Sequence, residues 1–171
     1  YRADPWTKKT LENGLNPELA AKAGNALQKY VIENTRLGIP LFLAEEAPHG
    51  HMAIGTTVFP TGIGMAATWS PVLIEEVGNV IAKEIRSQGA HISYGPVLDL
   101  SRDPRWSRVE ETFGEDPVLS GRLGAAMVIG LGSGDLSREY ATIATLKHFL
   151  AYAVPEGGQN GNYASVGTRD L

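Results

Sequence analysis

Residues 95–117 read GPVLDLSRDPRWSRVEETFGEDP, and the character of this stretch changes after Leu98. The residues up to Leu98 have the apolar composition of a short buried strand. Charges of both signs then crowd the chain, namely Asp99, Arg102, Asp103, Arg105, Arg108, Glu110, Glu111, Glu115 and Asp116. So many charges are incompatible with a core, and the arginine guanidinium is a rigid fork suited to holding carboxylates or hydroxyls in fixed geometry. We interpret the segment as an ordered polar site on the loop after a strand, with a plain solvated loop as the alternative.

Length and composition place the chain among single globular domains. It has 171 residues, 43% of them hydrophobic, which suffices for one core. Fifteen Lys and Arg against 19 Asp and Glu give a net charge of -4 without a basic stripe, so we expect no nucleic-acid partner. The absence of cysteine excludes disulfides and thiolate metal sites, and no apolar run approaches the roughly 20 residues of a membrane span. The first residues do not resemble a signal peptide. Because the chain starts without Met, we expect it to be a piece of a longer polypeptide.

Each predicted helix starts with the same signal, a capping side chain followed by proline at the first helical position. The pairs are Asn16-Pro17, Ser70-Pro71 and Asp116-Pro117. Apolar residues then recur at the spacing of three and four that marks one buried helix face. Their positions are Leu19, Ala20, Ala23, Ala26, Leu27, Tyr30 and Val31; Leu73, Ile74, Val77, Val80, Ile81 and Ile85; and Leu119, Leu123, Ala126, Met127 and Ile129. We expect these helices to end near Thr35, at Gly89, and at Gly130 or Gly132.

Apolar runs of strand length alternate with the helices, at residues 39–44, 92–98 and 141–146. This alternation predicts an α/β fold with a parallel sheet. Each run is followed directly by ionisable residues, namely Glu45 and Glu46, then Asp99, then Lys147 and His148. Because the carboxyl ends of parallel strands lie on one side, where ligands of such folds bind, we expect these groups to converge on one cavity. The alternative is that the charges only mark where strands enter solvent.

Several motifs along the chain resemble glycoside hydrolase family 3 in their order and approximate spacing. They are GIPL (38–41), TVFP (57–60), AATW (66–69), GPVLD (95–99), RDPRWSR (102–108), ETFGEDP (111–117) and KHF (147–149). The resemblance covers essentially the whole chain. It implies that residues 1–171 are part of one (β/α)₈ TIM-type barrel domain, truncated at both ends and without an internal domain boundary. A whole barrel takes about 250 residues.

The resemblance also implies roles for individual residues. Lys147 and His148 resemble the adjacent pair that hydrogen-bonds hydroxyls of the non-reducing sugar in the innermost subsite, and Arg108 the arginine that completes this grip. Glu46 stands where many members have an Asp that binds two outer hydroxyls. His49 is expected to shape its loop. Candidates for the pocket wall are Tyr152 and Glu156.

The catalytic groups implied by the resemblance are missing from this sequence. Family members are mostly β-glucosidases and β-xylosidases that retain the anomeric configuration, using a carboxylate nucleophile and a separate acid/base. Both motifs are expected outside residues 1–171, so the chain alone should be inactive and should pack against the remainder of the same enzyme as a second polypeptide segment. The implied substrate is a β-linked oligosaccharide or glycoside, with no cofactor. The family favours a periplasmic or secreted location over a cytoplasmic one.

Other functional classes are alternatives to this resemblance. A metal-dependent hydrolase could use the histidines and carboxylates, although no His-Glu-x-x-His pattern is present; the histidines are His49, His51, His91 and His148. A non-catalytic carbohydrate-binding domain would need exposed aromatic platforms, and the only tryptophans are Trp6, Trp69 and Trp106. The glycines of residues 130–134 follow a helix, which argues against nucleotide binding. The N-acetylglucosaminidase branch is disfavoured because residues 150–153 lack its histidine.

Overall fold

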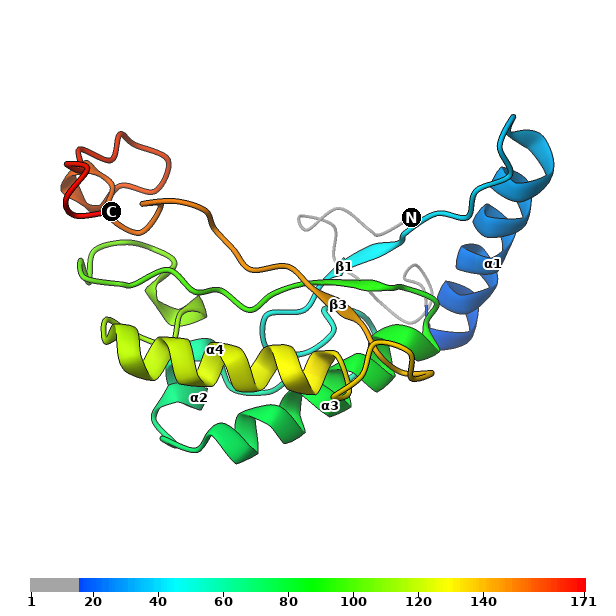
Figure 1. The fold of residues 1–171 in the computed structure, drawn as a ribbon, viewed down its shortest axis with the longest axis horizontal. Coiled ribbons are helices and arrows are strands. Elements are labelled where there is room, and N and C mark those ends of the chain that lie inside the picture. The colour runs from blue at the N-terminus through cyan, green and yellow to red at the C-terminus, as the bar shows by residue number, and fades with distance from the viewer. Residues whose placement is uncertain (1–15) are drawn as a thin grey trace.

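A computed structural model describes residues 16–171, so the expectations for residues 1–15, including Trp6, lie outside it. Helices alternate with short strands along the chain (Figure 1). The elements are α1 (Pro17–Asn34), β1 (Ala44–Glu46), α2 (Gly62–Ala66), α3 (Pro71–Ser87), β2 (Ile92–Tyr94), η1 (Val109–Glu111), α4 (Pro117–Leu131), β3 (Ile143–Ala144) and η2 (Glu156–Gly158), of which η1 and η2 are 3₁₀ turns. Helix α2 was not predicted from the sequence.

The predicted helix starts are confirmed atom by atom. The side chains of Asn16, Ser70 and Asp116 each accept a hydrogen bond from the backbone N–H three residues later, at 2.9, 3.3 and 2.7 Å. Each cap satisfies a donor that the helix leaves unpaired, which contributes about 1 kcal/mol. The predicted stop of α3 is also confirmed, because Gly89 takes a φ of +92° directly after the helix. That left-handed conformation is one that glycine adopts at little cost.

The sheet is parallel, as predicted, with the strand order β1-β2-β3. Its strands are shorter than the apolar runs, and the prediction of a buried strand over residues 39–44 is wrong. The strand covers Ala44–Glu46 instead, and Phe42 is 71% exposed. The reason lies at Leu41, whose backbone N–H and C=O both pair with the side-chain amide of Gln28, each at 2.8 Å. These groups are therefore unavailable to a strand ladder.

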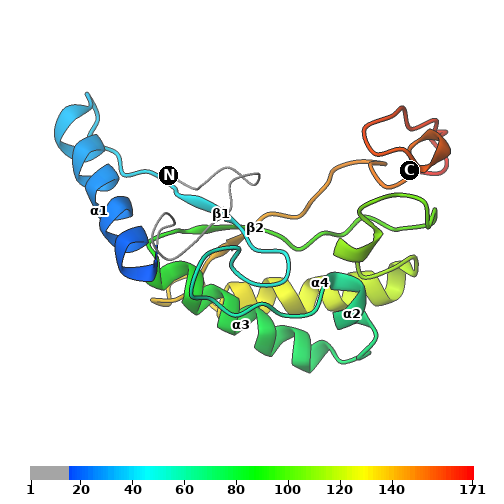
Figure 2. The ribbon, with the colours of Figure 1, turned by 180° about the vertical axis from the view of Figure 1, so that it is seen from behind.

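Helices α3 and α4 pack together on one face of the sheet and enclose most of the core (Figures 1 and 2). Their buried side chains include Ile74, Val77, Ile81, Ile85, Leu123, Ala126, Met127 and Leu131. The helices approach closely at Gly78, where an added Cβ would lie 2.9 Å from the Met127 carbonyl oxygen. Three residues predicted to face inward, Leu73, Val80 and Ile129, are exposed instead. At 3.6 residues per turn, Leu73 and Val80 lie at the margin of the buried face of α3, and Ile129 lies on the side of α4 away from Met127 and Leu131.

Helix α1 stands at one end of the molecule, away from the α3/α4 pair (Figure 1). The residues of its predicted apolar face are mostly uncovered, since Leu19, Leu27 and Tyr30 are exposed and burial in this helix is confined to Ala20 and Gly24. Within residues 16–171, no helix covers the sheet face opposite α3 and α4. Apolar surface of this kind marks a face that packs against another element or partner. None of the described helices is both long and apolar enough to span a membrane.

Candidate functional site

Four of the five ionisable residues predicted to converge at the strand ends pair there, Lys147 with Glu46 and His148 with Asp99, whereas Glu45 is buried within β1. Glu46 is the last residue of β1, and Asp99 follows β2 in the chain. Lys147 follows β3 and is fixed beside the continuation of β2 by its backbone, because its carbonyl accepts from the Leu98 N–H at 2.7 Å and its own N–H donates to the Pro96 carbonyl at 3.3 Å. This pairing continues the parallel ladder past the end of β3. The side chains that leave the ladder here lie on the carboxyl side of the sheet, where parallel α/β folds bind ligands.

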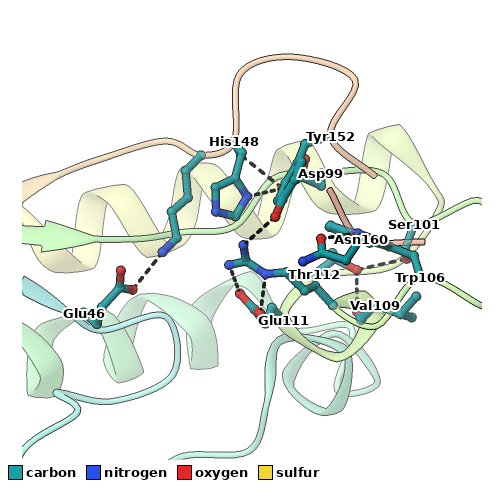
Figure 3. A network of polar contacts seen from close by, with 12 residues as sticks. Glu46, Asp99, Ser101, Trp106, Val109, Glu111, Thr112, His148, Tyr152 and Asn160 are labelled. Atoms are coloured by element: carbon teal, nitrogen blue, oxygen red, sulfur yellow. Dashed lines mark hydrogen bonds and ion pairs between the residues drawn. The ribbon is translucent and has the colours of Figure 1, made fainter. Parts of the chain in front are cut away.

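Lys147, which follows β3, and Glu46, at the end of β1, form an ion pair. The lysine Nζ donates to Oε2 of Glu46 at 2.8 Å. The lysine side chain is 13% exposed and the glutamate side chain 42% exposed. The ammonium is thus held in place largely out of solvent, while the carboxylate remains open on one side. Figure 3 shows this glutamate beside the rest of the polar network.

His148 is held by Asp99, whose side chain is only 3% exposed. The Oδ2 atom of Asp99 accepts from the backbone N–H of His148 at 3.0 Å and lies 2.8 Å from its ring Nδ1. The imidazole also packs edge-on against the ring of Tyr152, with centroids 4.8 Å apart (Figure 3). The ring is therefore fixed from two sides, and its orientation leaves Nδ1 turned toward the carboxylate.

Arg108 forms a bidentate ion pair with Glu111. Its Nε and Nη2 donate to the two carboxylate oxygens at 2.6 and 2.7 Å, and Nη1 donates to the Tyr152 hydroxyl at 3.3 Å. The hydrogen bond to Glu111 raises the pKa of Arg108. Burial alone would raise the pKa of Glu111, but the hydrogen bonds from Arg108 and the positive charges of Arg108 and Lys147 outweigh it and lower that pKa. Glu111 therefore stays ionised.

Tyr152 joins the arginine to the histidine, which agrees with its expected place in the pocket wall. Its ring lies under the Arg108 guanidinium at 5.4 Å and meets the indole of Trp106 edge-on at 5.5 Å. Trp106 is 1% exposed and donates from Nε1 to Asn160 at 3.0 Å. A buried tryptophan cannot serve as a stacking platform, so the reading as a platform-type carbohydrate-binding module gains no support from Trp106. Its role is to support Tyr152.

Two hollows border these residues. The larger has a volume of about 540 Å³, and its lining includes Asp99, Lys147 and His148 together with Ser165, Val166, Asp170 and Leu171. The smaller, about 300 Å³, lies between Arg108, His148 and Tyr152. Pockets for small molecules span about 300–1,000 Å³. Lys147, His148 and Arg108 therefore border space of the size that a monosaccharide requires, while Glu46 lines neither hollow.

The remaining candidates lie elsewhere. Nδ1 of His49 is 3.0 Å from the Phe59 carbonyl, and the Phe59 N–H donates to the His49 carbonyl at 2.9 Å, so this histidine fastens the loop after β1 as expected. Glu156 is exposed at the start of η2 and lines neither hollow. In the described part of the chain, no three His, Cys, Asp or Glu side chains are grouped as a metal ion would require. The metal-hydrolase alternative therefore gains no support.

Each nitrogen-bearing side chain of the site is paired with a different carboxylate, a feature that sequence reasoning missed. Lys147 pairs with Glu46, His148 with Asp99 and Arg108 with Glu111. The sequence named most of these residues but not their pairing, because only the Arg108–Glu111 pair is close in the chain. For that pair the spacing of three was an available signal, since it is a common distance for contact within one helical turn.

Comparison with known proteins agrees with this geometry. The model of the "Glycosyl hydrolase family 3 N terminal domain" matches residues 10–171. A periplasmic beta-glucosidase of Salmonella typhimurium is 36% identical over 145 residues, covering 85% of this chain and 18% of that protein. A beta-xylosidase of Formosa agariphila is 40% identical over 146 residues, covering 81% of this chain and 20% of that protein. The chain thus spans about a fifth of the length of these relatives.

Solved structures give the same result. A β-glucosidase involved in saponin metabolism from intestinal bacteria superposes with a TM-score of 0.83 at 40% identity, over 92% of this chain and 21% of that one. A β-glucosidase of Listeria innocua in complex with isofagomine has a TM-score of 0.82 at 34% identity, over 96% of this chain and 24% of that one. The parallel βα units, the convergence of polar groups at the strand ends and these matches lead to one conclusion. This chain belongs to glycoside hydrolase family 3 and is part of the (β/α)₈ barrel of its N-terminal domain.

Proposed function

We propose that this chain supplies the innermost sugar-binding subsite of a retaining β-glycosidase that removes non-reducing terminal β-linked glucose or xylose. The substrate classes are those of the relatives, which carry the names beta-glucosidase and beta-xylosidase. The observation that carries the proposal is the convergence of Lys147, His148 and Arg108, each held by its own carboxylate, around hollows of monosaccharide size.

Donor arithmetic supports Arg108 as a sugar ligand. The guanidinium has five N–H groups. Glu111 takes one from Nε and one from Nη2, and Tyr152 takes one from Nη1. One N–H on each terminal nitrogen is left to donate to ligand hydroxyls. Because Glu111 and Tyr152 fix the plane of the guanidinium, these donors are aimed before substrate arrives, which lowers the entropy cost of binding.

Glu46 supplies the complementary acceptors. Lys147 occupies Oε2, which leaves Oε1 and the second lone pair of Oε2 for hydroxyls. The glutamate side chain is open to solvent, so an arriving sugar can reach it. Lys147 donates through a three-proton ammonium, of which Glu46 uses one proton. The pair can therefore bridge neighbouring hydroxyls, one accepting from the lysine and one donating to the glutamate.

The chemical step requires groups outside residues 1–171. A retaining glycosidase needs a nucleophilic carboxylate and an acid/base whose pKa is raised. Glu46, Asp99 and Glu111 already hold the three nitrogen groups, and the pKa of Glu111 is lowered. We infer that the nucleophile and acid/base come from the remainder of the same enzyme, and that residues 1–171 form one piece of a single barrel domain without an internal boundary. A periplasmic or secreted location is favoured by relatives named periplasmic beta-glucosidases.

The test uses the full-length enzyme that contains this chain, assayed on aryl β-glucosides and aryl β-xylosides. We expect hydrolysis of at least one of them, and proton NMR of the first-formed sugar should show the β-anomer, because the mechanism retains configuration. His148→Ala and Arg108→Ala should each lower kcat/KM by more than about tenfold. Inversion at the anomeric carbon, or wild-type turnover by both variants, would contradict the proposal.

A further inference from the structure

The hydrogen bonds around Asp99 determine more than the position of the His148 ring. Oδ2 of Asp99 receives the backbone N–H of His148 at 3.0 Å and faces the ring Nδ1 of the same residue at 2.8 Å. A backbone N–H can only donate, and an aspartate carboxylate can only accept. The short contact to Nδ1 is therefore favourable when Nδ1 carries a proton. A neutral imidazole with its proton on Nδ1 has a lone pair on Nε2.

We propose that Asp99 is a positioning residue that fixes His148 in the Nδ1–H tautomer, so that Nε2 accepts a hydrogen bond from a sugar hydroxyl. This inference rests on the proposed function, because it takes the ligand of His148 to be a sugar. Burial strengthens the effect. The Asp99 side chain is 3% exposed, so little water competes for Oδ2, and the ring is kept from flipping by its edge contact with Tyr152.

An acceptor at Nε2 of His148 lets the site select for a hydroxyl that donates a proton, which its cationic side chains cannot do. Lys147 and Arg108 donate only, so either would tolerate a fluorine in place of the hydroxyl oxygen that it contacts. A hydroxyl facing Nε2 of His148 must instead give its proton, which fluorine lacks. One ring position of the sugar should thus require a hydroxyl as donor. The site then excludes analogues that keep the shape and the acceptor but not the proton.

The experiment measures dissociation constants by calorimetry on the full-length enzyme. The probes are glucose and its deoxy and deoxyfluoro analogues at carbons 3, 4 and 6, with the xylose series if xylosides are preferred. Fluorine discrimination is expected wherever a hydroxyl donates, at Glu46 as well as at His148. At the position that faces His148, the deoxy and the deoxyfluoro sugar should both bind about tenfold or more weakly than the parent, the loss expected for one missing hydrogen bond to a well-ordered group. This position is identified as the one at which the difference between parent and fluoro sugar disappears in His148→Ala. Sugar binding is used because fluorine also disfavours the transition state electronically.

Variants of Asp99 separate the tautomer from the negative charge. In Asp99→Ala nothing fixes the proton on Nδ1, and the fluorine discrimination should fall to below about threefold. Asp99→Asn keeps a side-chain oxygen that accepts both N–H groups, so it should restore the discrimination. Asp103→Ala is the matched control. Asp103 lies in the same loop, but it is paired with the exposed Arg105 at 2.7 Å and lines neither hollow, so the discrimination should be unchanged.

Two results would overturn the inference. The first is a wild-type enzyme that binds every fluoro analogue as well as its parent, which would mean that His148 donates. The second is an Asp99→Asn variant that discriminates as poorly as Asp99→Ala, which would mean that the charge of Asp99 matters and its acceptor geometry does not. Hydrolysis is measured separately. An enzyme that binds sugars with the expected fluorine pattern but cleaves no aryl glycoside contradicts the proposed function alone, whereas failure to bind any sugar contradicts both.

Discussion

Glu111 offers the sharpest test of how the site is organised, because it is predicted to act through Arg108. The change is Glu111→Ala, with Glu110→Ala as the matched control. Both glutamates lie in η1, but Glu110 is exposed, whereas Glu111 holds both Nε and Nη2 of the arginine. Loss of Glu111 leaves Arg108 with only the long contact to Tyr152. The guanidinium should then rotate away from the geometry in which its remaining donors face substrate.

The size of the effect follows from burial. Exposed ion pairs couple by about 0.2–1 kcal/mol, and removal of one partner from a fully buried pair costs about 3–5 kcal/mol. The side chains of Arg108 and Glu111 are 25% and 23% exposed, and their two bonds of 2.6 and 2.7 Å are short. An intermediate coupling of about 2 kcal/mol is therefore expected, which corresponds to about a 30-fold loss in kcat/KM.

A double-mutant cycle measures this coupling directly. The kcat/KM for an aryl β-glycoside is determined in the full-length wild type, Glu111→Ala, Arg108→Ala and the double variant. Glu111→Ala should lower kcat/KM about 30-fold when Arg108 is present and less than about threefold when Arg108 is absent. The smaller loss reflects the weaker attraction between Glu111 and its other cationic neighbours. An equal cost in both backgrounds, or a loss no larger than that of Glu110→Ala, would refute the reasoning.

Three further predictions concern binding, pH and the isolated chain. Lys147→Ala should lower kcat/KM more than about tenfold while shifting the unfolding temperature little, because it removes a ligand donor and no core contact; wild-type turnover of both aryl β-glucoside and β-xyloside would contradict it. Burial and the nearby Arg86 lower the pKa of His91 from 6.5, and Nδ1 of this histidine lies 3.3 Å from the Leu43 N–H that donates to it. The unfolded state therefore binds a proton at His91 more readily than the folded state does. The contribution of neutral His91 to stability is complete above pH 6.5 and is lost as the pH falls. The unfolding temperature should therefore drop less between pH 7.5 and 5.5 in His91→Gln than in the wild type. Residues 1–171 expressed alone should be poorly soluble and show no glycosidase activity, because within residues 16–171 the outer strand edges and the face of α1 lack partners. A monomeric, cooperatively melting and active 171-residue protein, verified by mass, would contradict this.

Sequence alone sufficed at the helix starts, because the deciding interaction there is local. The caps at Asn16, Ser70 and Asp116 reach a backbone N–H only three residues away, so the helix starts could be predicted correctly. The alternation of apolar runs with helices was enough for the parallel sheet. Because every strand of such a sheet points the same way, it was also enough to bring residues 46, 99, 147 and 148 to one side.

Tertiary structure decided which of these groups touch. Lys147 meets Glu46 across 101 positions of sequence, and His148 meets Asp99 across 49. Contacts of this kind depend on strand register and on the path of each loop, which no periodicity encodes. The start of β1 was settled in the same way, because the amide of Gln28, from another element, occupies both backbone groups of Leu41. The chemistry of each group was therefore fixed by its residue type, while its partner, its proton position and its freedom to bind a ligand were fixed only when distant segments packed together.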